Sequence, residues 1–170
     1  IKANAVITYI ENGEISDTTP VTGASIAIQG GNDTFITKVV ADAAGAQPQA
    51  GLLIKNTQAV WVTDSDFIHQ GTGLAITPVS GIVTWCFFNN TAFDSNSSDA
   101  ILINPTGTAV ANGIFFNGAW ASTSQRGINI MKGPTATVDG VYANGMAILN
   151  NRQQGVLVQN GKNIEFNGSR

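Results

Sequence analysis

IFFNG (Ile114–Gly118), VYANG (Val141–Gly145) and IEFNG (Ile164–Gly168) are three nearly identical stretches, each an apolar or aromatic run followed by Asn-Gly. CFFNN (Cys86–Asn90) and DFIHQG (Asp66–Gly71) are looser copies. Alternating apolar residues indicate half-buried strands, and Asn-Gly indicates a tight turn. A strand-and-turn phrase that recurs along the chain predicts a fold built from stacked copies of one unit.

A second phrase accompanies the first in most units: a small residue, an apolar residue, a variable residue and another apolar residue. Two or three short strands in a repeat of 22–28 residues predict a right-handed parallel β-helix of about six coils, an all-β fold. In such a solenoid each strand pairs with its copy one coil on, about 4.8 Å away. An antiparallel sandwich with Asn-Gly hairpins is the alternative, but the spacing is too long for simple hairpins. The first apolar positions of the phrase are Ile26, Leu52, Leu74, Ile101, Ile128 and Val156.

The length of 170 residues suits one domain with a substantial core. We expect residues 25–170 to form the β-helix and to be followed by further sequence in a longer protein. Residues 1–24 fit the repeat poorly, so we expect an irregular strand-and-turn segment or a first coil there.

The composition argues against several classes of partner. Charged residues make up 11%, the net charge is −3, and no Lys or Arg lies between Lys55 and Arg126. Nucleic-acid binding needs several cations to neutralise phosphates, so no nucleic-acid partner is expected. No apolar stretch approaches the roughly 20 residues of a membrane helix, so no membrane insertion is expected. No cofactor or metal is expected, and Cys86, the one cysteine, is expected to be a buried apolar residue.

Aligning the units predicts two columns of stacked side chains. One is a turn ladder formed by His69, Asn89, Asn117, Asn144 and Asn167. The other faces outward two residues earlier and contains Phe67, Phe87, Phe115 and Tyr142. An exposed apolar column usually marks a contact surface. Cover by a loop of the same chain, contact between subunits and stacking of sugar rings are the three interpretations.

Asp64 and Asp66 are the candidate catalytic residues, in the stretch WVTDSDFIHQG (Trp61–Gly71). Glycoside hydrolysis uses two carboxyl groups, one as an acid and one as a base or nucleophile. Solvated turn residues are the alternative interpretation of Asp-Ser-Asp, so no catalytic residue is assigned.

The coil pattern GhxhxN…hxhxNG, the low charge and the many Asn, Gly and Thr residues resemble the pectate-lyase-like β-helix superfamily. Within it the chain is most similar to β-helical proteins of bacteriophage virions, the tailspikes and capsid decoration proteins. The resemblance covers Ser25–Arg170, and the Asn-Thr-Asp, Asp-Asp, His-Gly and Arg-Ile-Lys motifs of plant-wall pectinases do not occur. It implies a homotrimer on the virion surface, made in the host cytoplasm. Other virion proteins and bacterial surface polysaccharide are the partners it implies.

The expected function is therefore that of a virion structural protein, a trimeric spike, knob or capsid decoration, with glycan binding as a further expectation. The alternative is a polysaccharide-degrading depolymerase of the tailspike type, a hydrolase or a lyase, or a fragment of one. A fragment of a bacterial adhesin or autotransporter is a third interpretation, because it shares the solenoid.

Overall fold

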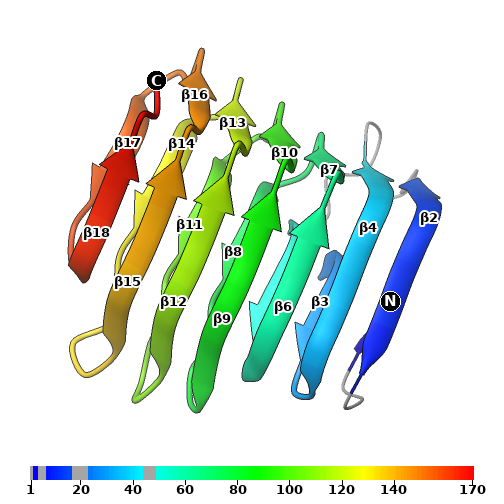
Figure 1. Ribbon diagram of the computed structural model, residues 1–170. Helices are drawn as coiled ribbons and strands as arrows, with labels where there is room; N and C mark the ends of the chain where they lie inside the picture. The colour runs from blue at the N-terminus through cyan, green and yellow to red at the C-terminus, as the bar shows by residue number, and fades with distance from the viewer. Residues whose placement is uncertain (1, 4–6, 17–22, 44–48) are drawn as a thin grey trace.

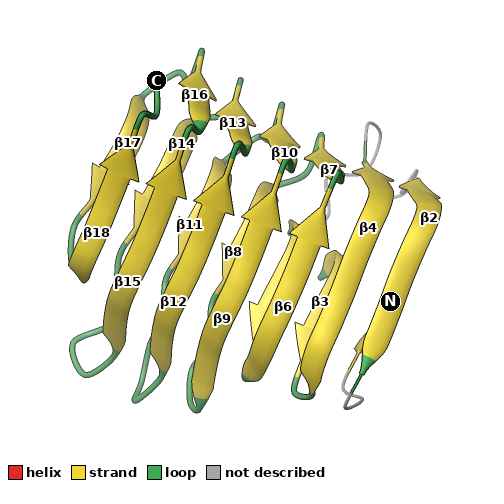
Figure 2. Ribbon diagram, in the orientation of Figure 1, coloured by secondary structure: helices red, strands yellow, loops and turns green. Residues whose placement is uncertain are grey.

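A computed structural model describes residues 2–3, 7–16, 23–43 and 49–170. These residues form strands and connecting loops, and none of them forms a helix (Figure 2). The strands stack in parallel into a β-solenoid of about six turns (Figure 1). The predicted all-β parallel β-helix is thus confirmed.

The second sequence phrase forms a seven-stranded parallel sheet along one side of the solenoid. The six apolar positions from Ile26 to Val156 that define the phrase lie in register across six neighbouring strands, so the predicted period is confirmed. In order, the strands are β1 (Lys2–Ala3), β3 (Ala24–Gln29), β5 (Ala50–Lys55), β8 (Thr72–Ile76), β11 (Asp99–Ile103), β14 (Arg126–Ile130) and β17 (Gln154–Val158).

The first phrase forms the long strands of an eleven-stranded sheet. Asn89, Asn117, Asn144 and Asn167 lie in register at the ends of four of them, as predicted. The long strands are β2 (Thr8–Ser16), β4 (Asn32–Asp42), β6 (Thr57–Thr63), β9 (Ile82–Asn89), β12 (Val110–Asn117), β15 (Thr137–Asn144) and β18 (Lys162–Asn167).

A third, very short strand follows the long strand in four of the coils. Strand β4 joins the two series, because its first half pairs with β6 and its second half pairs with β7. Each of these coils therefore has three sides, and the third side carries a polar groove. The short strands are β7 (Asp66–Ile68), β10 (Ala92–Asp94), β13 (Trp120–Ser122) and β16 (Ala147–Leu149).

Close contact between coils explains the small residue that opens the second phrase. A Cβ on Gly73 would lie 2.6 Å from the carbonyl oxygen of Ala100, and one on Gly127 would lie 2.4 Å from that of Gly155. Real Cβ atoms do not approach oxygen so closely, so these positions exclude a larger side chain. The apolar residues beside them fill the core, whose largest buried side chains include Phe67, Phe88, Phe93 and Phe116.

The corner between the long side and the third side is a turn through a left-handed residue. The residue at this corner has a φ of 47° to 61° in seven coils, which Gly and Asn adopt readily. These left-handed residues are Asn12, Lys38, Asp64, Asn90, Gly118, Gly145 and Gly168.

Four of the five predicted ladder residues form a hydrogen-bonded ladder beside this corner. The Nδ2 atom of Asn117 donates to Oδ1 of Asn89 at 2.9 Å, Asn144 donates to Asn117 at 3.2 Å, and Asn167 donates to Asn144 at 3.4 Å. The placement of His69 in this ladder is wrong, because Thr63 lies in register with Asn89.

His69 instead follows the short strand β7. Its Nδ1 lies 2.8 Å from Oδ1 of Asp42. The stretch DFIHQG, which resembles the end of a long strand in sequence, forms the third side of its coil.

The N-terminal segment adds strands to the same stack. Strand β1 pairs with β3, and β2 pairs with β4, both in parallel. Residues 1, 4–6 and 17–22 of the predicted segment 1–24 lie outside the described residues.

Candidate functional site

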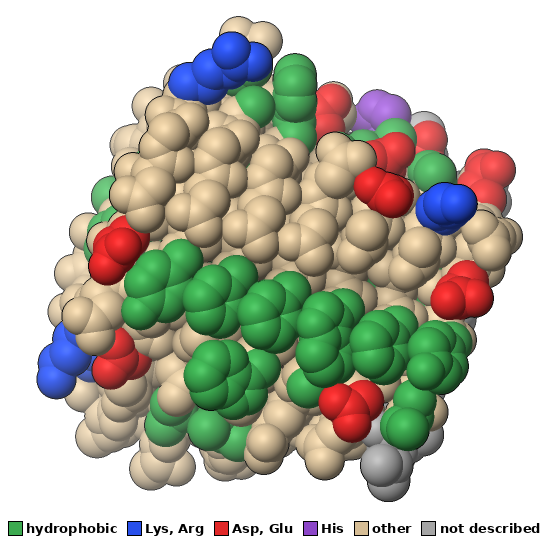
Figure 3. All heavy atoms as spheres, viewed as in Figure 1, with side chains coloured by type: hydrophobic (Ala, Val, Ile, Leu, Met, Phe, Trp, Pro, Cys, Tyr) green, Lys and Arg blue, Asp and Glu red, His purple; other side chains and the backbone are tan. Residues whose placement is uncertain are grey.

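An aromatic ladder runs along the outer face of the long strands. Its neighbouring rings stack with centroids 4.7–5.8 Å apart and planes inclined by 6–15°. Figure 3 shows the ladder as a continuous row of hydrophobic side chains across this face. The ladder residues are Tyr9, Phe35, Trp61, Phe87, Phe115 and Tyr142.

The structure places Phe87, Phe115 and Tyr142 in this outward column, as predicted, but not Phe67. Trp61 lies in register with Phe87, and Phe67 belongs to the short strand β7. The Phe67 side chain is 0% exposed and stacks on Phe93 with ring centroids 5.7 Å apart. Phe67 is therefore a core residue, and its assignment as a contact residue is wrong.

Each ring inside the ladder has its faces against its neighbours, so it presents mainly its edge to solvent. Tyr9, at the end of the ladder, is 64% exposed. A sugar ring stacks on the flat face of an aromatic ring, and the inner rings offer no free face. The ladder therefore suits contact with another apolar surface better than it suits sugar stacking.

Trp85 extends this apolar surface beside the ladder. It lies between Thr84 and Cys86 in β9, opposite Gly113 of β12, at a position where the backbone turns through the left-handed region, and its φ is 57°. Gly113 and Gly140 occupy the equivalent position in the next two coils, also at positive φ. The indole is 54% exposed and lies parallel to the Phe115 ring, with centroids 6.4 Å apart.

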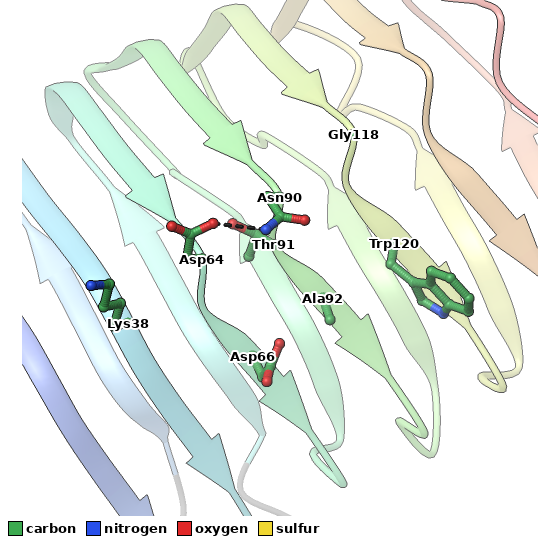
Figure 4. A pocket seen from close by; sticks show the side chains of 8 residues that line it. All are labelled: Lys38, Asp64, Asp66, Asn90, Thr91, Ala92, Gly118 and Trp120. Atoms are coloured by element: carbon green, nitrogen blue, oxygen red, sulfur yellow. Dashed lines mark hydrogen bonds between the residues drawn. The ribbon is translucent and has the colours of Figure 1, made fainter.

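A second surface, which we call the carboxylate groove, lies over the short strands. It is a cavity of about 500 Å³, shown in Figure 4. Asp64 and Asp66, the two predicted candidates, both line it. The complete lining is Lys38, Asp64, Asp66, Asn90, Thr91, Ala92, Gly118 and Trp120.

An adjoining hollow of about 400 Å³ extends the groove and shares Asp66, Ala92 and Trp120 with it. There Nε1 of Trp120 donates to Oγ of Ser122, and Ser122 donates to Oδ1 of Asp94. This chain of hydrogen bonds fixes the orientation of the indole along the groove. Trp120 remains 44% exposed.

The two carboxyl groups nearest Trp120 have opposite electrostatic surroundings. Partial burial raises the pKa of Asp66 above its usual value. Burial also acts to raise the pKa of Asp94, but hydrogen bonds from Ser122, Thr123 and Ser95 outweigh it and lower that pKa. A pair of carboxyl groups with diverging pKa values is the arrangement that acid–base catalysis uses.

Sequence reasoning missed Trp120 and did not connect Asp94 with Asp66. Both lie on three-residue strands, and only the stacking of the coils brings them together. A signal existed in the sequence, because AFD and WAS both follow a strand and an Asn-containing turn.

Other candidate groups do not contribute to the groove. Cys86 is fully buried, and this burial raises its pKa to about 12, so it is unsuited to act as a nucleophile. Within the described part of the chain, no group of three or more His, Cys, Asp or Glu side chains could hold a metal ion. The described residues also contain no helix long and apolar enough to cross a membrane.

The fold and these two surfaces define a parallel β-solenoid with an apolar aromatic stripe and a separate polar groove. Comparison with known proteins found no matching family model, no matching curated protein and no matching solved structure.

Proposed function

We propose that this chain is a structural β-helix of a bacteriophage virion, a spike, knob or capsid decoration, whose copies assemble into a homotrimer through the aromatic ladder. The observation that carries the proposal is the continuous apolar stripe over six ladder residues on one face. Contiguous exposed apolar surface on a soluble protein commonly marks an interaction site. The trimeric state and the virion setting follow from the resemblance to the phage β-helices.

Trp85 supports an interface on this face. A bulky aromatic residue at φ 57° is strained by about 1–2 kcal/mol relative to an ordinary conformation. The equivalent glycines, Gly113 and Gly140, show that the fold does not need a tryptophan at this position. Exposed tryptophans are frequent anchors of protein interfaces. We infer that Trp85 is the anchor of the subunit contact.

The asparagine ladder next to the stripe makes the same face easier to bury. The side-chain amides of Asn89, Asn117, Asn144 and Asn167 bond to one another. Polar groups that already have partners lose less free energy when water is removed than unpaired ones do. A second subunit could therefore cover the aromatic ladder and the neighbouring asparagine ladder with only a small desolvation cost for the amides. The solution mass of the protein, with substitutions in the ladder, tests the proposal.

The carboxylate groove favours a second candidate function, hydrolysis of a polysaccharide. Asp66 lies opposite Ala92 in the neighbouring strand, and Asp94 follows two residues later on the same face. Inverting glycosidases hold two carboxyl groups roughly 6.5–9.5 Å apart, so that a water molecule lies between the base and the sugar. Two carboxyl groups on neighbouring strands of one face suit that arrangement.

Release of reducing ends from bacterial capsule or lipopolysaccharide tests this second candidate. Asp66→Asn and Asp94→Asn should each abolish release, and Asp139→Asn, on another side of the solenoid, should not. Equal rates in all three variants would remove these carboxyl groups from any hydrolysis.

A further inference from the structure

A slot lies within the carboxylate groove, over the small side chain of Ala92. Asp66, Ala92 and Trp120 occupy equivalent positions on three neighbouring strands. Two strand spacings separate the first from the third, which is roughly 9.5 Å. Figure 4 shows Asp66 and Trp120 on opposite sides of Ala92. We call this gap, which has the small Ala92 side chain between two larger ones, the Ala92 slot.

The Trp120 wall of the slot is a flat aromatic face that no other described ring covers. Its partners in the register are Ala92 on one neighbouring strand and Ala147 on the other, and both have small side chains. This distinguishes Trp120 from the inner rings of the aromatic ladder. Its bond to Ser122 fixes the ring in place, so no rotamer freedom is lost when a ligand stacks on it.

The opposite wall and the rim of the slot are acidic. Asp64, Asp66 and Asp94 line the groove and its extension, where Lys38 is the one cationic residue among the lining side chains. The Asp64 carboxylate accepts a hydrogen bond from Nδ2 of Asn90 at 2.7 Å. The groove therefore attracts positive charge and repels a polyanion.

We propose that the Ala92 slot binds a sugar ring that carries a protonated amino group, so that the ligand of the groove is an amino-sugar chain. The apolar face of the ring stacks on Trp120, and the ammonium group faces Asp66. Uronic-acid chains are excluded by the three carboxylates. Binding here does not depend on trimer formation, because the slot lies on the short strands and the aromatic ladder lies on the long ones. This proposal names the class of ligand for the second candidate function. It rests on that function only where a bound chain is also hydrolysed, since binding alone does not require hydrolysis.

Titration of the ¹⁵N-labelled chain with three oligosaccharides tests the proposal. The probes are oligomers of glucosamine, of N-acetylglucosamine and of galacturonic acid, at about pH 6, where amines are protonated and most carboxyl groups are ionised. The glucosamine oligomer should shift the Trp120 indole N–H resonance saturably. The N-acetylated oligomer, which has the same ring without the charge, should bind about tenfold more weakly. The galacturonate oligomer should not bind.

Two substitutions locate the site. Ala92→Leu fills the slot without changing any charge, and Trp120→Ala removes the stacking face. Each should weaken glucosamine-oligomer binding about tenfold, as followed in all variants through the backbone N–H resonances of the groove, while Asp139→Asn should leave it unchanged. Asp66→Asn should reduce the preference for the amine over the N-acetylated form.

Three results would overturn the proposal: no saturable shift with the glucosamine oligomer, equal affinity for the two glucosamine forms, or full affinity in Ala92→Leu and Trp120→Ala. Circular dichroism of each variant establishes that it is folded. Solution mass and reducing-end release are measured on the same samples. The mass reports on assembly and the release reports on hydrolysis, so a failure of sugar binding can be told apart from a failure of either proposed function.

Discussion

The side-chain amide of Asn117 donates to Oδ1 of Asn89 at 2.9 Å and accepts from Asn144 at 3.2 Å. Asn167 donates to Asn144 at 3.4 Å, which is its one side-chain bond to another asparagine among the described residues. An interior member of this ladder therefore makes two side-chain bonds, and the terminal member makes one.

Asn117→Ala should lower the free energy of unfolding by about 1–2 kcal/mol, because two net hydrogen bonds are lost and the amides of Asn89 and Asn144 lose a partner. Asn167→Ala should cost about half as much. Urea denaturation measures both. Equal losses at the two positions would show that the ladder contributes no stability beyond the turn itself.

Gly127→Ala should destabilise the solenoid by about 1–3 kcal/mol, since the added Cβ would lie 2.4 Å from the carbonyl oxygen of Gly155. Gly155→Ala is the matched control. A Cβ there has its nearest contact, Ile148, at 3.5 Å, so the change should be close to neutral. Thermal unfolding of both variants compares them. Similar melting temperatures would contradict the close approach of these two coils.

Asp94 should make stability depend on acidity. Its pKa in the folded state lies below the ordinary value of 3.8, so the ionised carboxylate stabilises the fold. That contribution is fully present above about pH 3.8 and is lost as the pH falls through the folded-state pKa. Asp94→Asn should therefore reduce the loss of stability between about pH 6 and about pH 2. Urea midpoints at both pH values measure it, and an unchanged pH dependence would argue against the hydrogen bonds from Ser122 and Ser95.

Trp85→Gly should weaken self-association by about 30-fold or more, because an anchoring tryptophan commonly contributes about 2 kcal/mol or more to an interface. Its fold should persist, since Gly113 and Gly140 occupy the same position in the next coils. Val79→Ser is the control, because Val79 is 63% exposed and lies outside the long strands. Sedimentation equilibrium measures the association. An equal effect of the two substitutions would remove Trp85 from the contact.

The period of the solenoid was predictable because equivalent positions in successive coils require side chains of the same size and hydrogen-bonding capacity. Small residues such as Gly73 and Gly127 recur where coils approach closely, and asparagines recur where amides can bond along the axis. The alignment failed in the coil of Trp61. Thr63 and Asp64 there replace Asn-Gly, and Asp64 adopts the left-handed conformation that Gly118 has elsewhere.

Only part of the groove was predictable. Asp64 and Asp66 were found because two nearby carboxylates suggest sugar chemistry. Trp120 and Asp94 were not connected to them, since a three-residue strand shows no measurable periodicity. Groove residues from neighbouring coils lie about 27 residues apart in the sequence and come together only when the coils stack. The sequence of one short strand does not indicate which residues of the next coil will lie beside it.

The solution mass of the protein, by light scattering on a size-exclusion column, tests the central proposal most directly. Assembly through the aromatic ladder predicts three times the chain mass of 17.7 kDa. The double substitution Phe87→Ser and Phe115→Ser should then give the single-chain mass with β-sheet circular dichroism retained. A wild-type protein at the single-chain mass would contradict the proposal.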